Sequence, residues 1–324
     1  MDTEGLACRA TEARTHVDLL DVTVLLGGPS SEREVSLQSG SAVAAALARR
    51  GHRVSRADIS PDDLSALERP GIEVVFIALH GSFGEDGRVQ QLCEDRGLLY
   101  VGCGPRASAV AMDKVAGKQL FRQAHLPTPD WVVIEPALEP ARRRELAAGV
   151  GLPCVVKPID AGSSVGVSIA RDASDRDAAV ERLLASHGRA MVEAFVAGRE
   201  MTVGVLDGRP LPVIEIRPAR AFYDYFAKYQ DDATQYIVNP EMSPEARRLL
   251  AESALAAWRA LGCRDMSRVD FILDGEGRAH VLEVNTIPGF TSHSLLPKAA
   301  AAVGIGFDQL CDALVRMAWR RGGR

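Results

Sequence analysis

The sequence lacks the charge pattern of a nucleic-acid-binding protein and the apolar length of a membrane protein. Its net charge is −5 and no basic run stands out, which argues against nucleic acid as a partner. No apolar stretch approaches the ~18 residues that a membrane span requires. The first residues include Asp2 and Glu4 in place of an apolar segment, so we expect no secretory signal. We therefore expect a cytoplasmic protein without a membrane or nucleic-acid partner.

Closely spaced cysteine pairs are also absent. The cysteines are spread along the chain, and no two of them form a C-x-x-C motif. This spacing predicts reduced thiols and argues against a disulfide framework or a zinc site. The cysteines are Cys8, Cys93, Cys103, Cys154, Cys263 and Cys311.

Lysine is scarce in this chain. Of the 38 basic residues only five are lysine, at positions 114, 118, 157, 228 and 298. Because arginine is used almost everywhere else, the lysines are candidates for places that need a compact ammonium group, such as a phosphate site. Chance is the competing explanation.

The rest of the composition is that of an ordinary globular protein of 324 residues, which is long enough for two or three domains. Residues 18–104 alternate strands with helices, as in a parallel α/β, Rossmann-like domain. Residues 105–192 combine helices with short strands, which indicates an α+β domain, and residues 193–324 form a third. We expect a flexible extension at 1–17 and an irregular functional lid at 218–240.

Helix boundaries are marked clearly at two places in the sequence. A helix over 34–50 is expected to end before Gly51, a residue type that favours the left-handed conformation beyond a helix end. A second helix over 244–261 has Ser243 as its expected N-cap and Gly262 beyond its last turn.

The strongest sign of a functional site is a predicted hairpin, made by SRVDFILD (267–274) and RAHVLEVN (278–285). A two-residue turn at Gly275-Glu276 would place Arg268 opposite Glu283. Residues on a strand point alternately to opposite faces. The apolar face would then hold Val269, Phe271, Leu273, Leu282 and Val284.

The polar face of the hairpin would hold Arg268, Asp270, Glu283 and Asn285, with Asp270 opposite Val281. Three oxygen-bearing side chains beside an arginine favour a Mg²⁺ site, because Mg²⁺ binds a few hard oxygen ligands together with water and phosphate. The alternative is an amphipathic hairpin whose polar face is simply solvated. The small polar loop that follows Asn285, TIPGFTSHS, favours a site.

Lys157 ends a predicted buried strand just before the loop DAGSSVG (160–166). A lysine beside a glycine–serine loop is suited to bind phosphate, because the backbone N–H groups of the loop can surround anionic oxygens. The sequence is not a Walker A motif. A flexible hairpin loop is an equally good interpretation of this segment alone.

Glu32 and His80 follow the first and third predicted strands, where open α/β sheets bind ligands. A carboxylate after Gly27-Gly28 would repel a dinucleotide pyrophosphate, whereas it would bind the ammonium group of an amino acid. Glu32 would also be favoured simply as an acid at a helix start. His80 alone is as well explained by a structural role.

Aromatic residues gather with one lysine in FYDYFAKYQDDATQY (222–236). This segment is either a partner-binding surface or a lid that excludes water from the site. Exclusion of water would protect a reactive acyl phosphate.

Taken together, these segments resemble the D-alanine–D-alanine ligases of the ATP-grasp superfamily, from about residue 20 to 318. The matching stretches are VLLGGPSSEREVSLQSG (24–40), FIALHGSFGEDGRVQ (76–90), MDK (112–114), VVKPIDAGSSVGV (155–167), FYDYFAKY (222–229) and RVDFILDGEGRAHVLEVNTIPGFTSHSLLP (268–297). The resemblance implies a three-domain ATP-grasp fold.

The resemblance also implies roles for individual residues. The catalytic positions of the family fall on Glu32, Ser163, Tyr229, Arg268 and Gly289. Its substrate-binding positions fall on Glu32, His80, Arg268, Gly289, Ser294 and Leu295. Its ATP-binding positions fall on Lys114, Lys157, Ser163, Ser164, Glu193, Phe195, Val196, Glu200 and Lys228. Its metal ligands fall on Asp270, Glu283 and Asn285.

The implied reaction joins two D-alanine molecules in two steps and serves peptidoglycan precursor synthesis. The first carboxylate attacks the γ-phosphate of ATP to give an acyl phosphate and ADP, and the second amine then displaces phosphate. The implied partners are ATP, two Mg²⁺ ions, for which Mn²⁺ can substitute, and a second copy of the chain in a homodimer. A requirement for a monovalent cation is left open.

Two positions and three alternatives qualify the resemblance. Phe226 stands where many relatives have an acid, whereas Tyr229 follows the pattern of dipeptide-forming relatives. A ligase that uses D-lactate or D-serine as its second substrate is the first alternative. A non-catalytic nucleotide-binding protein is the second. A nicotinamide-dependent oxidoreductase is the third, and the absence of G-x-G-x-x-G argues against it.

Overall fold

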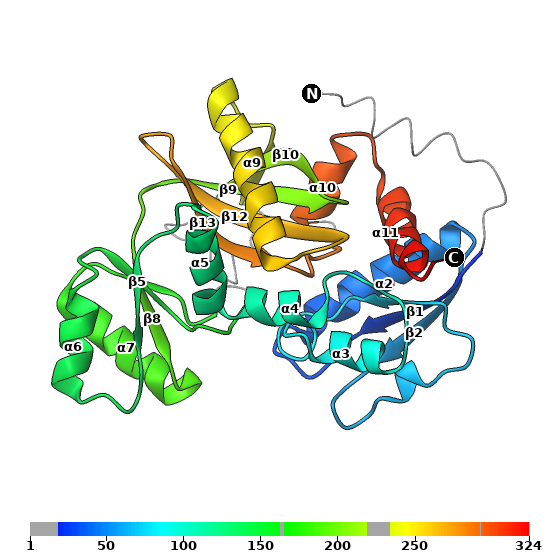
Figure 1. Ribbon diagram of the computed structural model, residues 1–324, viewed down its shortest axis with the longest axis horizontal. Coiled ribbons are helices and arrows are strands. Elements are labelled where there is room, and N and C mark those ends of the chain that lie inside the picture. The colour runs from blue at the N-terminus through cyan, green and yellow to red at the C-terminus, as the bar shows by residue number, and fades with distance from the viewer. Residues whose placement is uncertain (1–18, 163–164, 219–233, 292, 324) are drawn as a thin grey trace.

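The computed structural model describes residues 19–162, 165–218, 234–291 and 293–323. These residues form three β-sheets with helices packed around them (Figure 1). One sheet is parallel and the other two are antiparallel, which confirms the predicted combination of α/β and α+β architecture. Within these ranges no helix has the length and apolar character needed to cross a membrane.

The first sheet is parallel and consists of β1 (Asp21–Leu26), β2 (Arg53–Asp58), β3 (Val74–Ile77) and β4 (Tyr100–Val101). Its strand order is β2-β1-β3-β4. All residues of β1 are buried, as expected for a strand near the middle of a parallel sheet that is covered on both faces. This confirms the parallel α/β architecture predicted for this part of the chain.

Helices cover both faces of this sheet, namely α2 (Arg33–Arg49), α3 (Arg88–Asp95), α11 (Phe307–Arg321) and the short 3₁₀ helix Ser65–Leu67. Val22 and Leu314 belong to the apolar cluster that α2 and α11 form on one face. Ile77 and Val89 belong to the cluster on the other face, which includes α3. Although α11 is distant in sequence, it lies beside α2 (Figure 1). The N-terminal sheet is therefore covered in part by the C-terminal helix.

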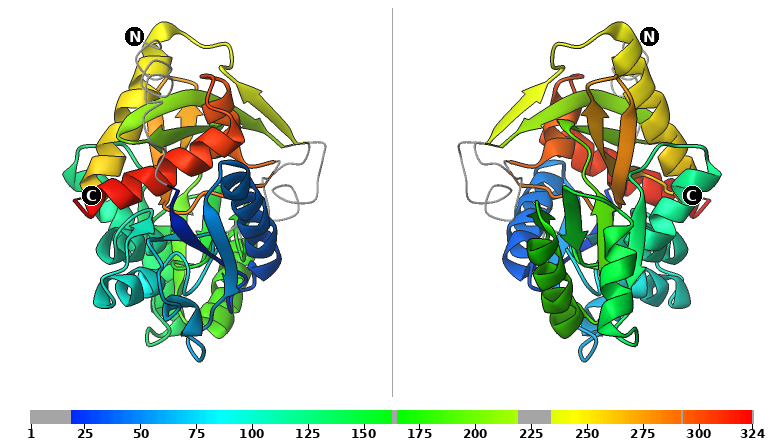
Figure 2. Two further views of the ribbon diagram at one scale, coloured as in Figure 1. Left: turned by 90° about the vertical axis from the view of Figure 1, so that its right-hand side faces the viewer. Right: turned by 90° about the vertical axis from the view of Figure 1, so that its left-hand side faces the viewer.

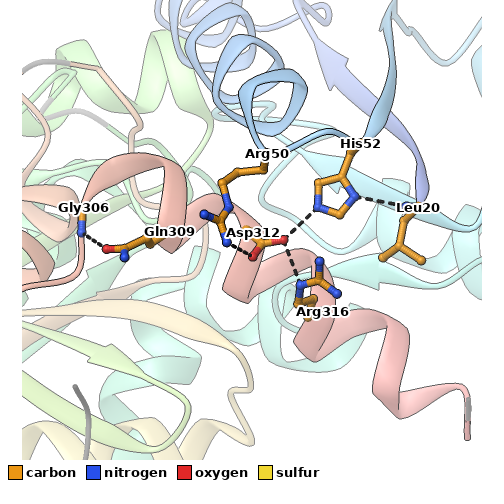
Figure 3. Close-up of polar contacts among 7 residues, drawn as sticks. All are labelled: Leu20, Arg50, His52, Gly306, Gln309, Asp312 and Arg316. Atoms are coloured by element: carbon orange, nitrogen blue, oxygen red, sulfur yellow. Dashed lines mark hydrogen bonds and ion pairs between the residues drawn. The ribbon is translucent and has the colours of Figure 1, made fainter. Parts of the chain in front are cut away.

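A buried polar cluster fastens α11 to the end of α2 (Figure 3). The Asp312 carboxylate accepts hydrogen bonds from His52 Nε2 at 2.8 Å, Arg316 Nε at 2.9 Å and Arg50 Nη2 at 3.1 Å. His52 Nδ1 accepts from the backbone N–H of Leu20, so the ring proton must lie on Nε2. Burial opposes ionisation of Asp312, but His52, Arg316 and Arg50 together lower its pKa.

The second sheet is antiparallel and consists of β5 (Trp131–Ile134), β6 (Cys154–Lys157), β7 (Ser168–Ala170) and β8 (Ala190–Ala194). It packs against α6 (Pro140–Ala148) and α7 (Ala173–His187). The predicted combination of helices and short strands is confirmed here, and β6 is the predicted strand that ends at Lys157. The strands β5 and β8 were not predicted. The expected division of the chain between residues 192 and 193 falls inside β8. The other expected domain limits stay predictions.

The third sheet is antiparallel, with strand order β11-β10-β9-β12-β13. Its strands are β9 (Gly198–Leu206), β10 (Arg209–Arg217), β11 (Gln235–Val238), β12 (Met266–Asp274) and β13 (Ala279–Asn285). The expectation of an irregular stretch over 218–240 is wrong for β11, which pairs with β10. Most of that stretch, 219–233, lies outside the described residues.

Helices pack on both faces of the third sheet, namely α4 (Pro105–Met112), α5 (Lys114–Gln123) and α9 (Pro244–Leu261) on one face and α10 (Leu295–Ala301) on the other. Figure 2 shows the orange strands β12 and β13 between the yellow α9 and the orange-red α10. The Ser243 hydroxyl caps α9 by accepting from Ala246 N–H, and Gly262 follows at φ +72°. Gly51 follows α2 at φ +93°. Both predicted helix ends are confirmed.

Candidate active site

The β12–β13 hairpin carries the polar face predicted from the sequence, although the predicted register is wrong. Asp270 lies opposite Glu283, and Arg268 lies opposite Asn285. A two-residue turn would have placed Arg268 opposite Glu283 and Asp270 opposite Val281. The four polar side chains nevertheless share one face of the sheet, because the register differs by two residues at this end and side chains alternate with a period of two.

Two irregularities explain the register of the hairpin. The turn contains three residues instead of two, because Asp274 N–H bonds to the carbonyl of Arg278, and Gly277 adopts φ +80°, as expected for a three-residue turn closed by a left-handed residue. A bulge then places Leu282 as an extra residue between Val281 and Glu283.

The bulge also moves a predicted core residue. We expected Leu282 on the apolar face of the hairpin. It instead lines a cavity between the second and third sheets, while Val281 is fully buried in the apolar cluster opposite Phe271. An extra residue on one strand reverses which side chains point inward.

Asp270 is held firmly at the centre of the polar face. Its two oxygens accept from Arg268 Nε at 2.9 Å and Arg268 Nη2 at 2.8 Å, and Thr202 Oγ1 donates to Oδ1 at 2.6 Å. Glu283 Oε2 lies 3.4 Å from Lys114 Nζ. Asn285 Oδ1 accepts from the N–H of Ile287. Arginine thus stands beside an acid pair on one face of the hairpin.

The chemistry of this donor set fits Mg²⁺. Asp270 and Glu283 offer carboxylate oxygens directly across from each other, and the amide oxygen of Asn285 extends the set. A carboxylate has about four lone-pair sites, and Asp270 accepts three hydrogen bonds, from Arg268 and Thr202. In the described part of the chain, no group of three or more His, Cys, Asp or Glu side chains is placed to hold a metal. A Mg²⁺ ion here would therefore rely on these three residues, water and phosphate oxygens.

A small cavity of about 90 Å³ opens in front of this polar face. Its wall includes Glu32, His80 and Arg268. His80 is fixed between Ser39, whose Oγ is 3.2 Å from Nε2, and Glu85, whose Oε1 is 3.5 Å from Nδ1. The sequence-predicted substrate residues of the N-terminal sheet thus meet the hairpin across one cavity.

Glycines make room for the Glu32 carboxylate in this cavity. A Cβ atom on Gly81 would lie 2.8 Å from Glu32 Oε2, and one on Gly162 would lie 3.0 Å from the same atom. Gly81 also has φ +69°, which an L side chain rarely adopts. Glu32 itself is buried. Both glycines therefore shape the place where its carboxylate lies.

Gly289 and Ser294 also line the small cavity. Ser294 Oγ accepts from the N–H of Thr291 at 2.8 Å, and a Cβ on Gly289 would lie 2.7 Å from that oxygen. Leu295 begins α10 directly afterwards and also lines the cavity. Gly289, Ser294 and Leu295, to which the resemblance assigns substrate binding, thus line the same cavity as Arg268.

A larger cavity of about 470 Å³ lies between the second and third sheets. Of the residues expected to bind ATP, Lys114, Lys157, Glu193, Phe195, Val196 and Glu200 line this cavity. Lys114 and Glu283 also line the small cavity, so the two spaces meet at this ion pair. Lys114 Nζ also donates to the carbonyl of Ala161 at 2.7 Å.

Two lysines bind one buried glutamate at the base of the larger cavity. Lys157 Nζ lies 2.7 Å from Glu193 Oε2, and Lys118 Nζ lies 2.7 Å from Glu193 Oε1. Burial opposes the charge on Glu193, but the two ammonium groups outweigh it and lower its pKa. Lys118 was not among the predicted site residues, although the scarcity of lysine was a signal that could have identified it.

A second group that sequence reasoning missed lies at another wall of the larger cavity. Glu215 is buried and accepts from Arg199 Nε at 2.9 Å and Arg199 Nη2 at 2.7 Å, and from Arg217 at 2.9 Å. The hydrogen bonds from Arg199 are the main cause of its pKa of about 2. A single acid within the apolar strand PVIEIR was the available signal.

Four predicted site residues lie outside the described residues. They are Ser163, Ser164, Lys228 and Tyr229. Phe226, which departs from the family pattern, lies there too.

The chain matches two family models. The model described as D-ala D-ala ligase C-terminus covers residues 120–316, and the model described as D-ala D-ala ligase N-terminus covers residues 63–103. The first of these alone spans more than half of the chain.

Similar proteins carry the same family name. A D-alanine–D-alanine ligase of Anaeromyxobacter sp. (strain K) is 45% identical over 91% of this chain and 95% of its own length. The ligase of Desulforudis audaxviator is 45% identical over 93% of this chain and 99% of its own.

Solved structures give the same result. The D-alanine–D-alanine ligase of Bacillus anthracis complexed with ATP is 32% identical, with a TM-score of 0.80 over 94% of this chain and 98% of that one. The VanG D-Ala:D-Ser ligase of Enterococcus faecalis is 29% identical, with a TM-score of 0.80 over 93% and 99%. The chain therefore belongs to the D-alanine–D-alanine ligase family.

Proposed function

We propose that this protein joins two D-alanine molecules to D-alanyl-D-alanine at the expense of ATP, for the synthesis of peptidoglycan precursors. The observation that carries the proposal is the meeting of two cavities at Lys114 and Glu283. The small polar cavity suits amino acids, and the larger one, with its apolar walls and lysines, suits a nucleotide. Their junction is where a substrate carboxylate and the γ-phosphate would meet.

The small cavity binds the two amino acids. The Glu32 carboxylate holds the ammonium group of the first D-alanine, and His80 lies near that substrate's carboxylate. Ser294 and Leu295 bind the carboxylate of the second D-alanine. This arrangement brings the reacting groups together before any bond changes, which replaces a bimolecular encounter by a positioned one.

The larger cavity binds ATP. Lys114 and Lys157 contact the phosphates, while Glu193, Phe195, Val196 and Glu200 surround the adenine and ribose. Ser163, Ser164 and Lys228 complete the phosphate contacts. The family resemblance implies that Ser163 and Tyr229 are hydrogen-bonding partners of Glu32.

Asp270, Glu283 and Asn285 would hold two Mg²⁺ ions. When bound, Mg²⁺ neutralises the negative charge that the phosphate oxygens carry and gain during phosphoryl transfer.

The reaction proceeds in two steps. An oxygen of the first D-alanine carboxylate attacks the γ-phosphorus of ATP. The bond between the γ-phosphorus and the oxygen that bridges it to the β-phosphate breaks. The products of this step are ADP and an acyl phosphate. The deprotonated amine of the second D-alanine attacks the acyl carbon, and collapse of the tetrahedral intermediate expels phosphate and leaves the peptide bond. The Arg268 guanidinium and the Gly289 N–H stabilise the developing oxyanion.

The first experiment is phosphate release from ATP with Mg²⁺, with D-alanine or L-alanine, and identification of the product by mass. We expect release that depends on D-alanine, together with the dipeptide. Offering D-serine and D-lactate alongside D-alanine distinguishes the alternative second substrates. ATP binding without D-alanine-dependent release would refute the substrate assignment.

A matched pair of variants locates the chemistry. Asp270→Asn removes the carboxylate that lies opposite Glu283, whereas Asp274→Asn removes one on the same strand that pairs with Arg278 and His280. We expect Asp270→Asn to lower kcat by a factor of about 10² or more, because charge stabilisation at a reacting phosphate is lost. Asp274→Asn should retain kcat. An equal change in kcat in the two variants would show that the reaction does not take place at Asp270.

We also propose, from the family, that the protein acts in the cytoplasm as a homodimer. Light scattering after size-exclusion chromatography measures the mass against the 34.8 kDa of one chain. A monomer at micromolar concentration would refute the dimer.

A further inference from the structure

Lys118 of α5 is fully buried, which is unusual for a lysine. Its ammonium group lies 2.7 Å from Glu193 Oε1 and donates to Thr128 Oγ1 at 2.6 Å. It also lies 5.1 Å from the centre of the Trp131 ring. Lys118 is not among the residues that line the larger cavity. Any effect that it has on a ligand must therefore act through the residues that it contacts.

Those contacts lead to both walls of the larger cavity. Glu193 lies on β8 of the second sheet and binds Lys157, which lines the cavity. Thr128 Oγ1 donates at 2.7 Å to the carbonyl of Val281 on β13 of the third sheet. One ammonium group thus joins the two sheets between which the cavity lies.

We propose that Lys118 is a positioning residue for ATP, which fixes Glu193 and Lys157 on one wall of the nucleotide cavity relative to β13 on the other wall. This inference rests on the proposed function, since it assumes that the larger cavity binds ATP. Lys118 occupies one oxygen of Glu193 and leaves the other to Lys157. Without Lys118, both oxygens of Glu193 would compete for Lys157 and its ammonium group would lose its fixed direction.

The charges of this cluster favour the same conclusion. Two lysines surround a single carboxylate in a buried place, which leaves one positive charge without a counter-charge within the Lys118–Glu193–Lys157 cluster. An uncompensated buried charge is costly in the free protein. A phosphate group at Lys157 would supply the missing negative charge. The cluster is therefore better suited to the ATP-bound protein than to the empty one.

Burial lowers the pKa of Lys118 to about 8. Burial is the largest cause of this value, Lys157 on β6 and Arg122 on α5 act in the same direction, and Glu193 on β8 acts in the opposite direction. Arg122 itself pairs with Asp130 in the segment before β5. A bound phosphate favours protonated Lys118, so ATP affinity should be full below pH 8 and fall as the pH rises above it.

The test compares Lys118→Met with Arg122→Met. Both residues lie on α5 and both cations lie over the Trp131 ring, but Arg122 pairs with the exposed Asp130 whereas Lys118 pairs with the buried Glu193. In Lys118→Met, Glu193 retains its ion pair with Lys157, and Thr128 retains its hydrogen bond to the carbonyl of Val281. No buried charge is therefore left without a partner. We therefore expect the variant to fold.

We expect Lys118→Met to raise KM for ATP and the Kd of ADP about tenfold, as for the loss of a charge-assisted buried network. The KM for D-alanine should stay unchanged, and the fall of ATP affinity above pH 8 should disappear. Arg122→Met should leave the KM for ATP, the Kd of ADP and the KM for D-alanine at their wild-type values below pH 8. Because Arg122 lowers the pKa of Lys118, this variant should keep the fall of ATP affinity but move it to higher pH.

A second variant keeps the proposal testable if Lys118→Met does not fold. Thr128→Val removes only the link from Lys118 to β13 and changes no charge. We expect it to raise KM for ATP a few-fold while the decline above pH 8 remains.

An ATP KM and an ADP Kd within twofold of wild type in folded Lys118→Met would overturn the proposal, as would an equal rise in both substrate KM values. Because ADP binding is measured without D-alanine, failure of the ligase assignment would show separately, as wild-type protein that binds ADP and forms no dipeptide.

Discussion

Replacing Asp312 by alanine would remove the acceptor that three donors share between α11 and the end of α2 (Figure 3). The His52 side chain is fully buried, and its Nε2–H has no other acceptor within this cluster. Arg50 is 42% exposed and can turn to water, while Arg316 is 19% exposed. Loss of the Asp312 carboxylate therefore costs a different free energy for each of the three donors.

The magnitude follows from these exposures. A buried donor that loses its acceptor costs about 1–3 kcal/mol, which applies to His52. The partly buried pair with Arg316 adds about 1 kcal/mol, and the exposed pair with Arg50 adds little. We expect Asp312→Ala to lower the free energy of unfolding by about 2–4 kcal/mol.

The assay is urea unfolding followed by tryptophan fluorescence, since Trp319 lies on α11 itself. The control is Asp308→Ala, on the same helix, which breaks a pair with the exposed Arg49 and should have a much smaller effect. Equal losses in the two variants would refute the argument from burial.

The effect of pH gives a second check on Asp312. Because its pKa is lowered in the folded state, its contribution to stability is full above about pH 4, the ordinary range of an aspartate, and is lost as the pH falls through the lowered value. The difference in free energy of unfolding between wild type and Asp312→Ala should therefore become smaller at acidic pH.

Three further predictions concern the two cavities. Gly81→Ala should raise KM for D-alanine several-fold and leave ADP binding unchanged, because its Cβ would lie 2.8 Å from Glu32 Oε2; an unchanged KM measured by phosphate release would contradict this. Removal of Mg²⁺ with EDTA should abolish phosphate release, and added Mg²⁺ should restore it in the wild-type protein but not in Glu283→Gln. Full activity of Glu283→Gln would exclude Glu283 as a Mg²⁺ ligand. Glu215→Gln should lower the Tm at pH 7, because Arg199 holds the pKa of Glu215 at about 2. The difference in Tm between the variant and wild type should become smaller as the pH falls from about 4 toward 2. A Tm difference that does not depend on pH would refute a stabilising role of the ionised Glu215 carboxylate.

The hairpin shows how far a periodic pattern can predict a site. Alternation along the two strands was sufficient to place Asp270 and Glu283 on one face. It did not reveal the three-residue turn at Gly277 or the bulge at Leu282, because alternation within a strand gives no information on turn length and Leu282 is itself apolar. The turn shifts the register by one residue and the bulge shifts it by one more. Together they restored the predicted face.

The lysine–glutamate cluster shows what a single sequence does not provide. Lys118 on α5 has the sequence context of an ordinary helix lysine, and Glu193 belongs to β8, a short strand that was not predicted. Their contact depends on how the second sheet packs beside α5, which no local pattern encodes. The few lysines gave a hint of their roles, but composition carries no information about partners. The roles of Ser163, Lys228 and Tyr229 stay predictions from the family resemblance.

The packing of α11 on the N-terminal sheet has a consequence for the order of synthesis. β1, β3 and β4 leave the ribosome early, whereas the helix that covers part of one sheet face is made roughly 10–40 s later at a rate of about 5–20 residues per second. Val22 and Phe76 belong to the apolar cluster that includes α11. Until α11 has been synthesised, part of the apolar surface of such residues stays exposed to water. The nascent first sheet is therefore the part of this protein on which we expect a chaperone to act while translation continues.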